Sequence, residues 1–295
     1  MSSNNKHRGF FNKYRKQMPV FETLIKDLSY AFISLKHYMG NGFKHKSILV
    51  YPHYPSRGST IYKVGNQLGY NVTNKPSKNI QFAVYWEYLT FREEYRFLEQ
   101  LAADKTVINL HSRDISKVYV DAIHQEVFGY CTIVDPLTYH GKMVKKNDIN
   151  AKHDGQIIDA PVQTVEEGYI YQILIDNSHS DHLVKDIRVP VVGEVLDFAY
   201  IKLREISERF KNTTINTQLE DIYQLFSKKE LGQINAFCKK LNLEYGELDI
   251  LRNNNDQKIY IVDINNTPQG PPANTSKKDA QVALNKIGEA LLKLV

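Results

Sequence analysis

The sequence predicts an α/β amino-terminal domain followed by an α+β module in which antiparallel sheets pack against helices. Up to about residue 110, short apolar runs alternate with helical periodicity. Strand-like segments dominate the next hundred residues, and helix start signals follow them. We therefore expect an extension at 1–46, a small α/β domain at 47–109 and a module at 110–295, with subdomains of about 110–175 and 176–295.

The composition is that of an ordinary folded protein. Of 295 residues, 42% are hydrophobic and 24% charged, which excludes the disordered, collagen-like and fibrous classes. The amino terminus is polar, and no apolar stretch approaches the roughly 18 residues of a membrane-spanning helix, so we expect a cytoplasmic protein. The two cysteines, Cys131 and Cys238, form no CxxC pair, which disfavours a disulfide framework and a cysteine-type zinc site.

Positive charge is concentrated in residues 1–46. This leader has nine Lys and Arg against two acids, a formal charge of +7, whereas the whole chain carries +5 and the remainder therefore −2. Apolar residues recur every three or four positions from 20 to 38, which predicts an amphipathic helix. Either this helix packs on the body behind a frayed tail, or the leader contacts an acidic partner or the inner membrane surface as a peripheral anchor. Because a nucleic-acid binder would spread its charge over one face, we expect no nucleic-acid partner.

The small domain is predicted to alternate strands and helices. Apolar runs predict strands at 47–51, 82–86 and 106–110. Helical patterns at 60–68 and 91–103 lie between them. In the loop before the first helix, Arg57 and backbone N–H groups could hold an anionic group, although a plain helix cap by Ser59 explains the same residues.

The larger module begins with a predicted helix at 114–128, which Gly129 ends. Apolar runs predict strands at 131–134, 142–145, 168–176, 187–192 and 195–204. A capping box, Ser227 to Glu230, opens a helix to about Leu241, and Ser276 begins the final helix. His179 and His182 lie outside a clear helix and lack the usual ligand geometry, so we expect no metal site there.

The segment 243–272 carries the most informative pattern. Two apolar strands flank the polar run 253–257, which predicts an antiparallel hairpin. Because side chains alternate along a strand, one face should be apolar, with Leu248, Ile250, Tyr260, Val262 and Ile264. Unless a bulge shifts the register, the other face carries Glu247, Asp249, Asp263 and Asn265.

Carboxylates gathered on one face repel each other and are costly to desolvate, so they need a cation or solvent. Carboxylate and amide oxygens are hard ligands that suit magnesium bound together with substrate phosphates. A solvated outer face of a sheet would explain the same residues without a site. The apolar backing and the loop from Thr267 to Pro272 favour a site.

The hairpin resembles a known family. Asp249, followed after the turn by Asp263-Ile264-Asn265-Asn266-Thr267-Pro268, is similar to the metal-binding end of the ATP-grasp fold, where an acid on one strand and an acid-x-Asn on the next hold magnesium and ATP phosphates. Further segments fall in that family's order across about residues 109–290. They resemble the opening segment (Asn109, 114–117), the phosphate-contacting lysine strand (143–146), the strand and hinge that pair with adenine (169–175) and the Asp-x-Arg-Val strand (186–192).

The resemblance implies a ligase that uses ATP and Mg²⁺, or Mn²⁺ in its place. Such an enzyme activates a carboxylate as an acyl phosphate, which an amine or another nucleophile then attacks. The implied metal ligands are Asp249, Asp263 and Asn265. The implied nucleotide contacts are Lys145, Lys146, Gln172, Ile173, Leu174, Arg188 and Asn265, with Arg188 and Lys145 as catalytic residues. Whether Lys145 or Lys146 faces the nucleotide depends on the strand register.

The resemblance leaves substrates and reaction type open. We expect a small-molecule carboxylate and an amine, from a small metabolite or a surface-polysaccharide precursor, with the acceptor between the small domain and the 267–272 loop. One departure is the segment 147–155, which has a single glycine where the family has a glycine-rich loop over the triphosphate. Two alternatives therefore stay open: a kinase on the same scaffold, and a nucleotide-binding or membrane-attached scaffold without catalysis.

Overall fold

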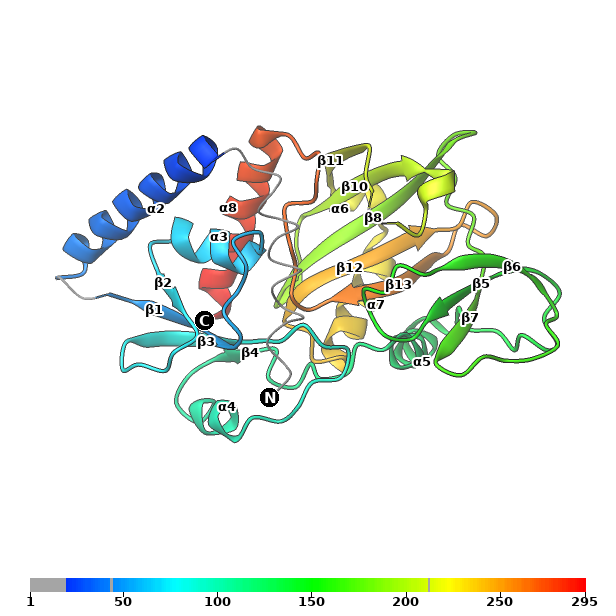
Figure 1. The fold of residues 1–295 in the computed structure, drawn as a ribbon, viewed down its shortest axis with the longest axis horizontal. Coiled ribbons are helices and arrows are strands. Elements are labelled where there is room, and N and C mark those ends of the chain that lie inside the picture. Colours follow the sequence, from blue (N-terminus) through cyan, green and yellow to red (C-terminus); the bar gives the residue numbers. More distant parts are fainter. Residues whose placement is uncertain (1–19, 43–44, 212) are drawn as a thin grey trace.

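The computed structural model describes residues 20–42, 45–211 and 213–295. Within these ranges the strands form three sheets (Figure 1). The small amino-terminal sheet has the order β2-β1-β3-β4, all parallel. Its strands are β1 (Ser47–Pro52), β2 (Asn71–Thr73), β3 (Ile80–Trp86) and β4 (Val107–Ile108).

Helices cover both faces of this parallel sheet, which explains why its strands are continuous apolar runs. On one face, Ile48 and Phe82 pack with α3 (Thr60–Gln67) and with the carboxyl-terminal helix α8 (Lys277–Leu294). On the other face, Leu49 and Tyr85 pack with α4 (Arg96–Leu101). The core around α8 also includes residues of the large sheet, so this last helix joins the small domain to the rest of the protein.

The large sheet is antiparallel, in the order β11-β10-β8-β12-β13, and a short β9 (Glu194–Val195) pairs with β8. Its strands are β8 (Leu183–Val192), β10 (Phe198–Glu205), β11 (Asn216–Asp221), β12 (Tyr245–Arg252) and β13 (Ile259–Asn265). One face buries the main core against α5 (Lys117–Phe128), α6 (Ile222–Leu225) and α7 (Lys228–Lys240). A 3₁₀ turn (Ile206–Glu208) follows β10.

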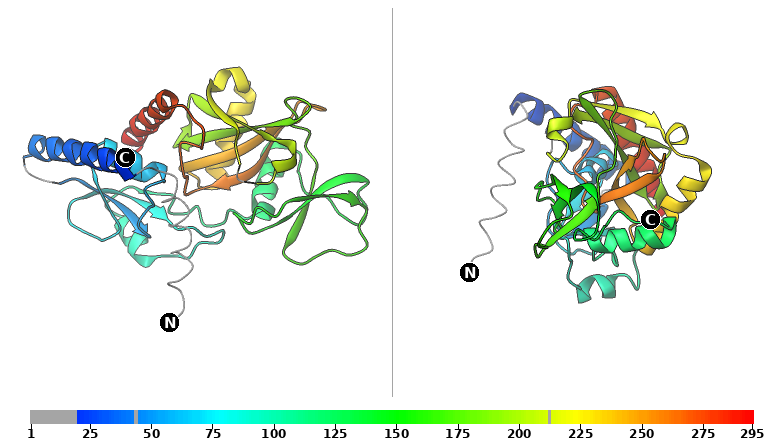
Figure 2. Two further views of the ribbon diagram at one scale, coloured as in Figure 1. Left: turned by 45° about the horizontal axis from the view of Figure 1, so that its top comes forward. Right: turned by 90° about the vertical axis from the view of Figure 1, so that its right-hand side faces the viewer.

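The third sheet lies at the far end of the molecule from the small domain (Figure 1). It has the order β6-β5-β7, with β5 (Gly141–Asn147), β6 (Gln156–Ala160) and β7 (Tyr169–Ile173). At the opposite end, α2 (Val20–Gly40) lies along the outside of α3 (Figure 2). No helix of the described ranges is long and apolar enough to cross a membrane.

Several element predictions need correction. The strand predicted at 131–134 forms only an isolated bridge, Ile133 to Gln172. The helix predicted at 91–103 is confined to α4, because Phe91 bridges to Asp114 before it. The strands β2, β6 and β11 were not predicted, since they are short or polar and lack alternation of apolar residues.

The predicted hairpin forms, and at its carboxylate end the four polar residues share one face as predicted. Glu247 pairs with Asn265 and Asp249 with Asp263 across β12 and β13. A bulge then shifts the register after Asp249. Beyond it, Ile259 and Ile261 enter the main core, so the prediction that Tyr260 and Val262 share the apolar face is wrong.

Candidate active site

Charged side chains gather on the face of the large sheet that is turned away from the main core. Strand alternation places them there, because the residues between them, such as Ile187 and Leu248, are buried in that core. The charged residues come from four adjacent strands: Lys202 and Arg204 on β10, Asp186 and Arg188 on β8, Glu247 and Asp249 on β12, and Asp263 on β13. We call this set the charged face.

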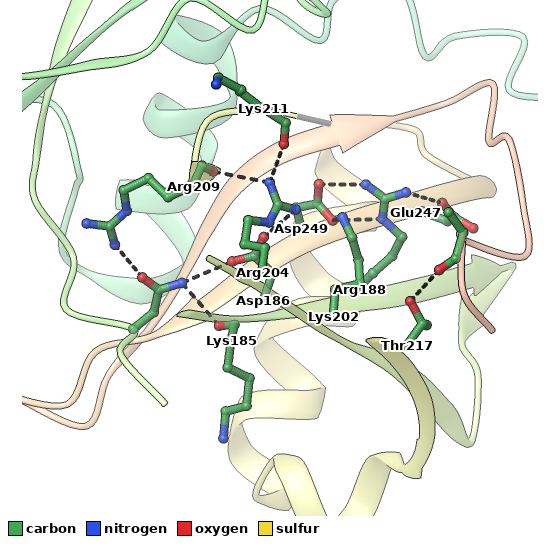
Figure 3. Close-up of polar contacts among 12 residues, drawn as sticks. Lys185, Asp186, Arg188, Lys202, Arg204, Arg209, Lys211, Thr217, Glu247 and Asp249 are labelled. Carbon is green, nitrogen blue, oxygen red and sulfur yellow. Dashed lines mark hydrogen bonds and ion pairs between the residues drawn. The ribbon is translucent and has the colours of Figure 1, made fainter. Parts of the chain in front are cut away.

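The centre of the charged face is a bidentate ion pair (Figure 3). Arg188 donates from Nε and Nη2 to the two carboxylate oxygens of Asp249, both at 2.8 Å. The Lys202 ammonium lies 4.0 Å from the same carboxylate. Burial alone would raise the pKa of Asp249, but Arg188 and Lys202 outweigh it and hold this pKa well below its usual range. The pair is therefore charged on both sides at neutral pH.

A second ion pair lies beside the first. Arg204 contacts Asp186 at 2.8 Å and donates to the backbone carbonyls of Arg209 and Lys211 at 3.1 and 2.8 Å (Figure 3). Burial raises the pKa of Asp186, against the opposing effect of Arg204. The charged face thus holds paired charges of both signs instead of a cluster of carboxylates alone.

Two carboxylates of the charged face are incompletely paired. Glu247 is 3% exposed, and its Oε2 accepts no hydrogen bond, although Arg188 lies 3.5 Å away. Burial raises the pKa of Glu247 to about 7. One oxygen of Asp263, Oδ1, is buried without a hydrogen-bond partner. Because an unsatisfied buried polar group costs about 1–3 kcal/mol, these two atoms are places where a ligand would add stability.

The predicted metal ligands lie together, in different states of pairing. The carboxylate of Asp249 accepts hydrogen bonds from Arg188, whereas Oδ1 of Asp263 accepts none from the described residues. The side-chain oxygen of Asn265 accepts from the backbone N–H of Thr267 at 3.0 Å. Among the described residues, no three His, Cys, Asp or Glu side chains form a metal-binding group. Two carboxylates and one amide fit a hard cation that has further oxygen ligands from a substrate.

The strand register separates the two lysines of β5. The Lys145 ammonium pairs with Glu166 and lies 4.5 Å from the centre of the Tyr169 ring. Lys146 points the opposite way and donates to the backbone carbonyl of Val262 at 3.2 Å, next to Asp263. Burial lowers the pKa of Lys146 to about 8, although Asp263 opposes this effect. The structure therefore brings Lys146, and not Lys145, to the charged face.

The predicted adenine hinge lies at the end of β7. The Gln172 side chain donates to the hydroxyl of Thr132, which itself donates to Asp121 at 2.6 Å. The backbone N–H of Ile173 donates to the Thr132 carbonyl at 2.8 Å, and Leu174 follows the strand. Gln172 and Ile173 are thus fixed to the segment that precedes β5.

Sequence reasoning missed four cations near this face. Lys202 and Arg204 lie on β10, and applying strand alternation to residues 198–205 would have placed both beside Asp186 and Arg188. Lys117, at the start of α5, donates to the side chain of Asn150 at 3.0 Å. Lys63 of α3 donates to the Gly270 carbonyl at 2.6 Å, and burial lowers its pKa to about 8. Lys117 belongs to the segment 114–117 that resembles the family's opening segment, although it was not predicted as a site residue, whereas Lys63 had no local sequence signal.

The 267–272 loop is fastened to the small domain. The backbone N–H of Thr60 donates to the Pro268 carbonyl at 3.0 Å, and Ser56 donates to the Gln269 side chain at 2.6 Å. Thr60, Tyr245 and Glu247 line the junction behind this loop. The hydroxyls of Thr60 and Tyr245 are buried beside each other, and Glu247 Oε2 is buried without a hydrogen-bond partner. The junction is therefore polar inside and open to hydrogen bonding.

The loop before α3 contributes a cap. Ser59 accepts from the backbone N–H of Tyr62 at 3.4 Å and caps α3, as the simpler interpretation of this loop predicts. Arg57 pairs with Asp27 of α2 at 2.7 Å and is 63% exposed, so it lies outside the charged face.

No protein-family model and no curated protein matches this sequence. Solved structures do resemble the fold. D-alanine–D-alanine ligase from Bacillus anthracis aligns with a TM-score of 0.53 and 15% identity, over 84% of this chain and 96% of that one. The same protein complexed with ATP aligns with a TM-score of 0.50 and 16% identity, over 84% of this chain and 95% of that one. A third structure is a Chryseobacterium gregarium RiPP-associated ATP-grasp ligase in complex with ADP and a leader and core peptide. It aligns with a TM-score of 0.47 and 13% identity, over 85% of this chain and 97% of that one. The first two likenesses confirm the predicted fold class.

Proposed function

The chain has the ATP-grasp fold, and we propose that it is an ATP- and Mg²⁺-dependent ligase that joins a small-molecule carboxylate to an amine or another nucleophile. The observation that carries this proposal is the charged face. Asp249 and Asp263 lie opposite each other on the hairpin, with Arg188 and Lys146 beside them. This combination of oxygen ligands and cations suits a nucleotide triphosphate bound through a metal ion.

Asp249, Asp263 and Asn265 are the proposed ligands of Mg²⁺, with Mn²⁺ as a substitute. The bound ion would neutralise charge on the nucleotide phosphates. To reach it, Asp249 must share its carboxylate with Arg188, which frees guanidinium donors for a phosphoryl group. The orphaned oxygen of Asp263 supports this assignment, because no described residue forms a hydrogen bond with it.

Arg188 and one lysine are proposed to stabilise negative charge on the transferring phosphoryl group. Lys146 is better placed for this role than Lys145, since Lys145 is engaged by Glu166. Lys202 and Arg204 add positive charge on β10, the strand next to Arg188. Gln172, Ile173 and Leu174 are proposed to border the nucleobase at the end of β7.

The acceptor is proposed to bind at the junction between the small domain and the 267–272 loop. Glu247 lies at this junction and within 3.5 Å of Arg188. Because the pKa of Glu247 is raised to about 7, its carboxylate is suited to accept a proton from an attacking amine. A small metabolite or a surface-polysaccharide precursor remains the predicted source of the substrates.

Two other functions remain to be tested against this one. A kinase on the same scaffold would release ADP with one acceptor, whereas a ligase needs an acid and a nucleophile together before phosphate accumulates. A scaffold without catalysis would bind the nucleotide and release no phosphate. The intact set of Arg188, Asp249 and Asp263 favours an enzyme.

The first experiment measures thermal stabilisation by a non-hydrolysable ATP analogue, with and without Mg²⁺, because a ligand that binds only the folded state raises its melting temperature. We expect Mg²⁺-dependent stabilisation of the wild type that is lost in Asp263→Ala. Glu126→Ala is the matched control, since Glu126 is an exposed acid on α5 that pairs with Lys240, outside the charged face. Absence of stabilisation in the wild type would contradict the proposed nucleotide site.

A further inference from the structure

The helix α2 has two different sides. Its inner side contacts the small domain: Tyr30 lies edge-on to Tyr62 with ring centres 6.4 Å apart, and Asp27 pairs with Arg57 at 2.7 Å. These contacts are made with α3 and the loop before it. Packing on the body, one of the two alternatives left open for this helix, is thus present, but it is made by the side that carries Asp27 and Tyr30 and not by the apolar residues whose spacing predicted the helix.

The outer side carries a row of large apolar side chains, which we call the α2 stripe. Its members are Leu24, Ile25, Leu28, Phe32, Leu35 and Met39, and each is 51–70% exposed. From Ile25 to Met39 they follow at intervals of three, four, three and four residues, so they lie in one line along the helix. At 1.5 Å per residue the line is about 21 Å long.

The α2 stripe is exceptional within the described part of the chain. No other described helix has more than two large apolar side chains of comparable exposure, and α8 has Val282 and Leu292. Soluble monomers seldom expose a contiguous apolar patch of this kind without a partner. Figures 1 and 2 show α2 at one end of the molecule, so a flat surface could approach the stripe without meeting the sheets.

Charge identifies the partner. The leader, residues 1–46, carries +7, while the remainder of the chain carries −2. Pairing of two α2 stripes would bring two leaders of +7 together, which like-charge repulsion opposes. An anionic lipid surface instead attracts the leader and accepts the apolar side chains. Exposed Lys36 lies one turn from Phe32 at the border of the stripe, where its ammonium can reach lipid phosphates.

We propose that the α2 stripe seats this protein on an anionic membrane surface, with α2 lying in the plane of the headgroups. The apolar side chains enter the boundary between headgroups and acyl chains, and the basic leader supplies the electrostatic attraction. Because the stripe is remote from the charged face, this proposal does not depend on the proposed function.

The test is co-sedimentation of the full chain with vesicles of phosphatidylcholine alone or with about 30% phosphatidylserine. We expect binding only to the anionic vesicles, and its loss at about 0.5 M salt, where exposed charges are screened. Leu28→Ser with Phe32→Ser should lower the bound fraction about tenfold, because the two most exposed members of the stripe are removed. The matched control is Val282→Ser with Leu292→Ser on α8, which should bind like the wild type.

Three results would overturn the proposal. One is a wild type that stays in the supernatant with anionic vesicles. Another is equal binding by the stripe variant, which would mean that the leader binds through charge alone. The third is a stable dimer in sedimentation equilibrium that the stripe variant dissociates, since the stripe would then be covered by a second copy. Equal melting temperatures of both double variants establish that each remains folded.

Discussion

The two faces of the large sheet use the same strands in opposite ways. On β8, Ile187 and Val189 face the main core, while Asp186 and Arg188, which alternate with them, belong to the charged face. The core face is close-packed and apolar, so its stability depends on shape and buried area. The charged face depends on pairing, and it leaves oxygens of Glu247 and Asp263 unsatisfied. A sheet optimised for stability alone would not keep such atoms, so the difference marks the charged face as a place for ligands.

The largest effect is expected when the central ion pair is broken. Arg188→Met removes the bidentate partner of Asp249 and leaves its carboxylate with the more distant Lys202 ammonium, 4.0 Å away, which should destabilise the fold by up to about 3–5 kcal/mol. Denaturant unfolding measures this loss. The double variant Arg188→Met with Asp249→Leu should recover much of the stability, because it replaces both charges by apolar groups. If the double variant is as unstable as the single one, pairing is not what stabilises this face.

The stability of the core face should depend on the volume of its buried side chains instead of on charge pairing. Leu248 is fully buried between the two acids of β12, and Leu248→Ala should cost about 2–5 kcal/mol of unfolding free energy. The loss should be the same at low and high salt, unlike that of Arg188→Met. Unfolding in urea at several concentrations of NaCl measures the loss of unfolding free energy in both variants. A strong salt dependence for Leu248→Ala would remove the contrast between the faces.

Glu247 should make stability depend on pH. Its folded pKa, about 7, is above its ordinary value of 4.5, so the folded state binds more protons between these values and loses stability as the pH rises from about 4.5 to 7. This contribution amounts to as much as about 3 kcal/mol. Glu247→Gln should flatten the pH profile of the melting temperature in that window. An unchanged profile would show that Glu247 does not titrate there.

Asp263→Asn is expected to change the free energy of unfolding least of these variants. It should nevertheless abolish the binding of Mg²⁺ with the ATP analogue. One oxygen of Asp263 has no partner to lose, so the free energy of unfolding should shift by less than about 1 kcal/mol. Stabilisation by Mg²⁺ with the ATP analogue should disappear, because a carboxylate ligand is lost. Thermal unfolding with and without both ligands measures the two effects. Retained stabilisation would remove Asp263 from the proposed metal site.

The sequence was most informative where alternation is uninterrupted. It predicted that Glu247, Asp249, Asp263 and Asn265 would share one face of the hairpin, and the pairs Glu247–Asn265 and Asp249–Asp263 confirm this up to the bulge. The bulge itself depends on how Ile259 and Ile261 pack beneath α5 and α7, which no local pattern reveals. The same limit applies to Lys63, which approaches Gly270 only because the small domain and the large sheet are packed together.

The choice between Lys145 and Lys146 illustrates a different limit. Adjacent residues on a strand point to opposite faces, so a shift of one residue exchanges their roles. The sequence contains both lysines and no signal for the face, whereas the pairing of β5 with β6 and β7 fixes it. The exposed face of α2 was unpredictable for another reason. An amphipathic pattern predicts that the apolar side packs inward, whereas α2 contacts α3 and the loop before it through the side that carries Asp27 and Tyr30.

The position of α8 has a consequence for the order in which the protein folds during synthesis. Ile287 and Leu291 of this helix complete the core around Ile48 and Ile61 of the small domain. The face of the small sheet that α3 shares with α8 therefore remains only partly covered until residues 277–294 have also been made. Such widely separated contacts slow folding and expose apolar strands in the nascent chain. A translational pause before α8 would lengthen the period in which the nascent chain needs a chaperone.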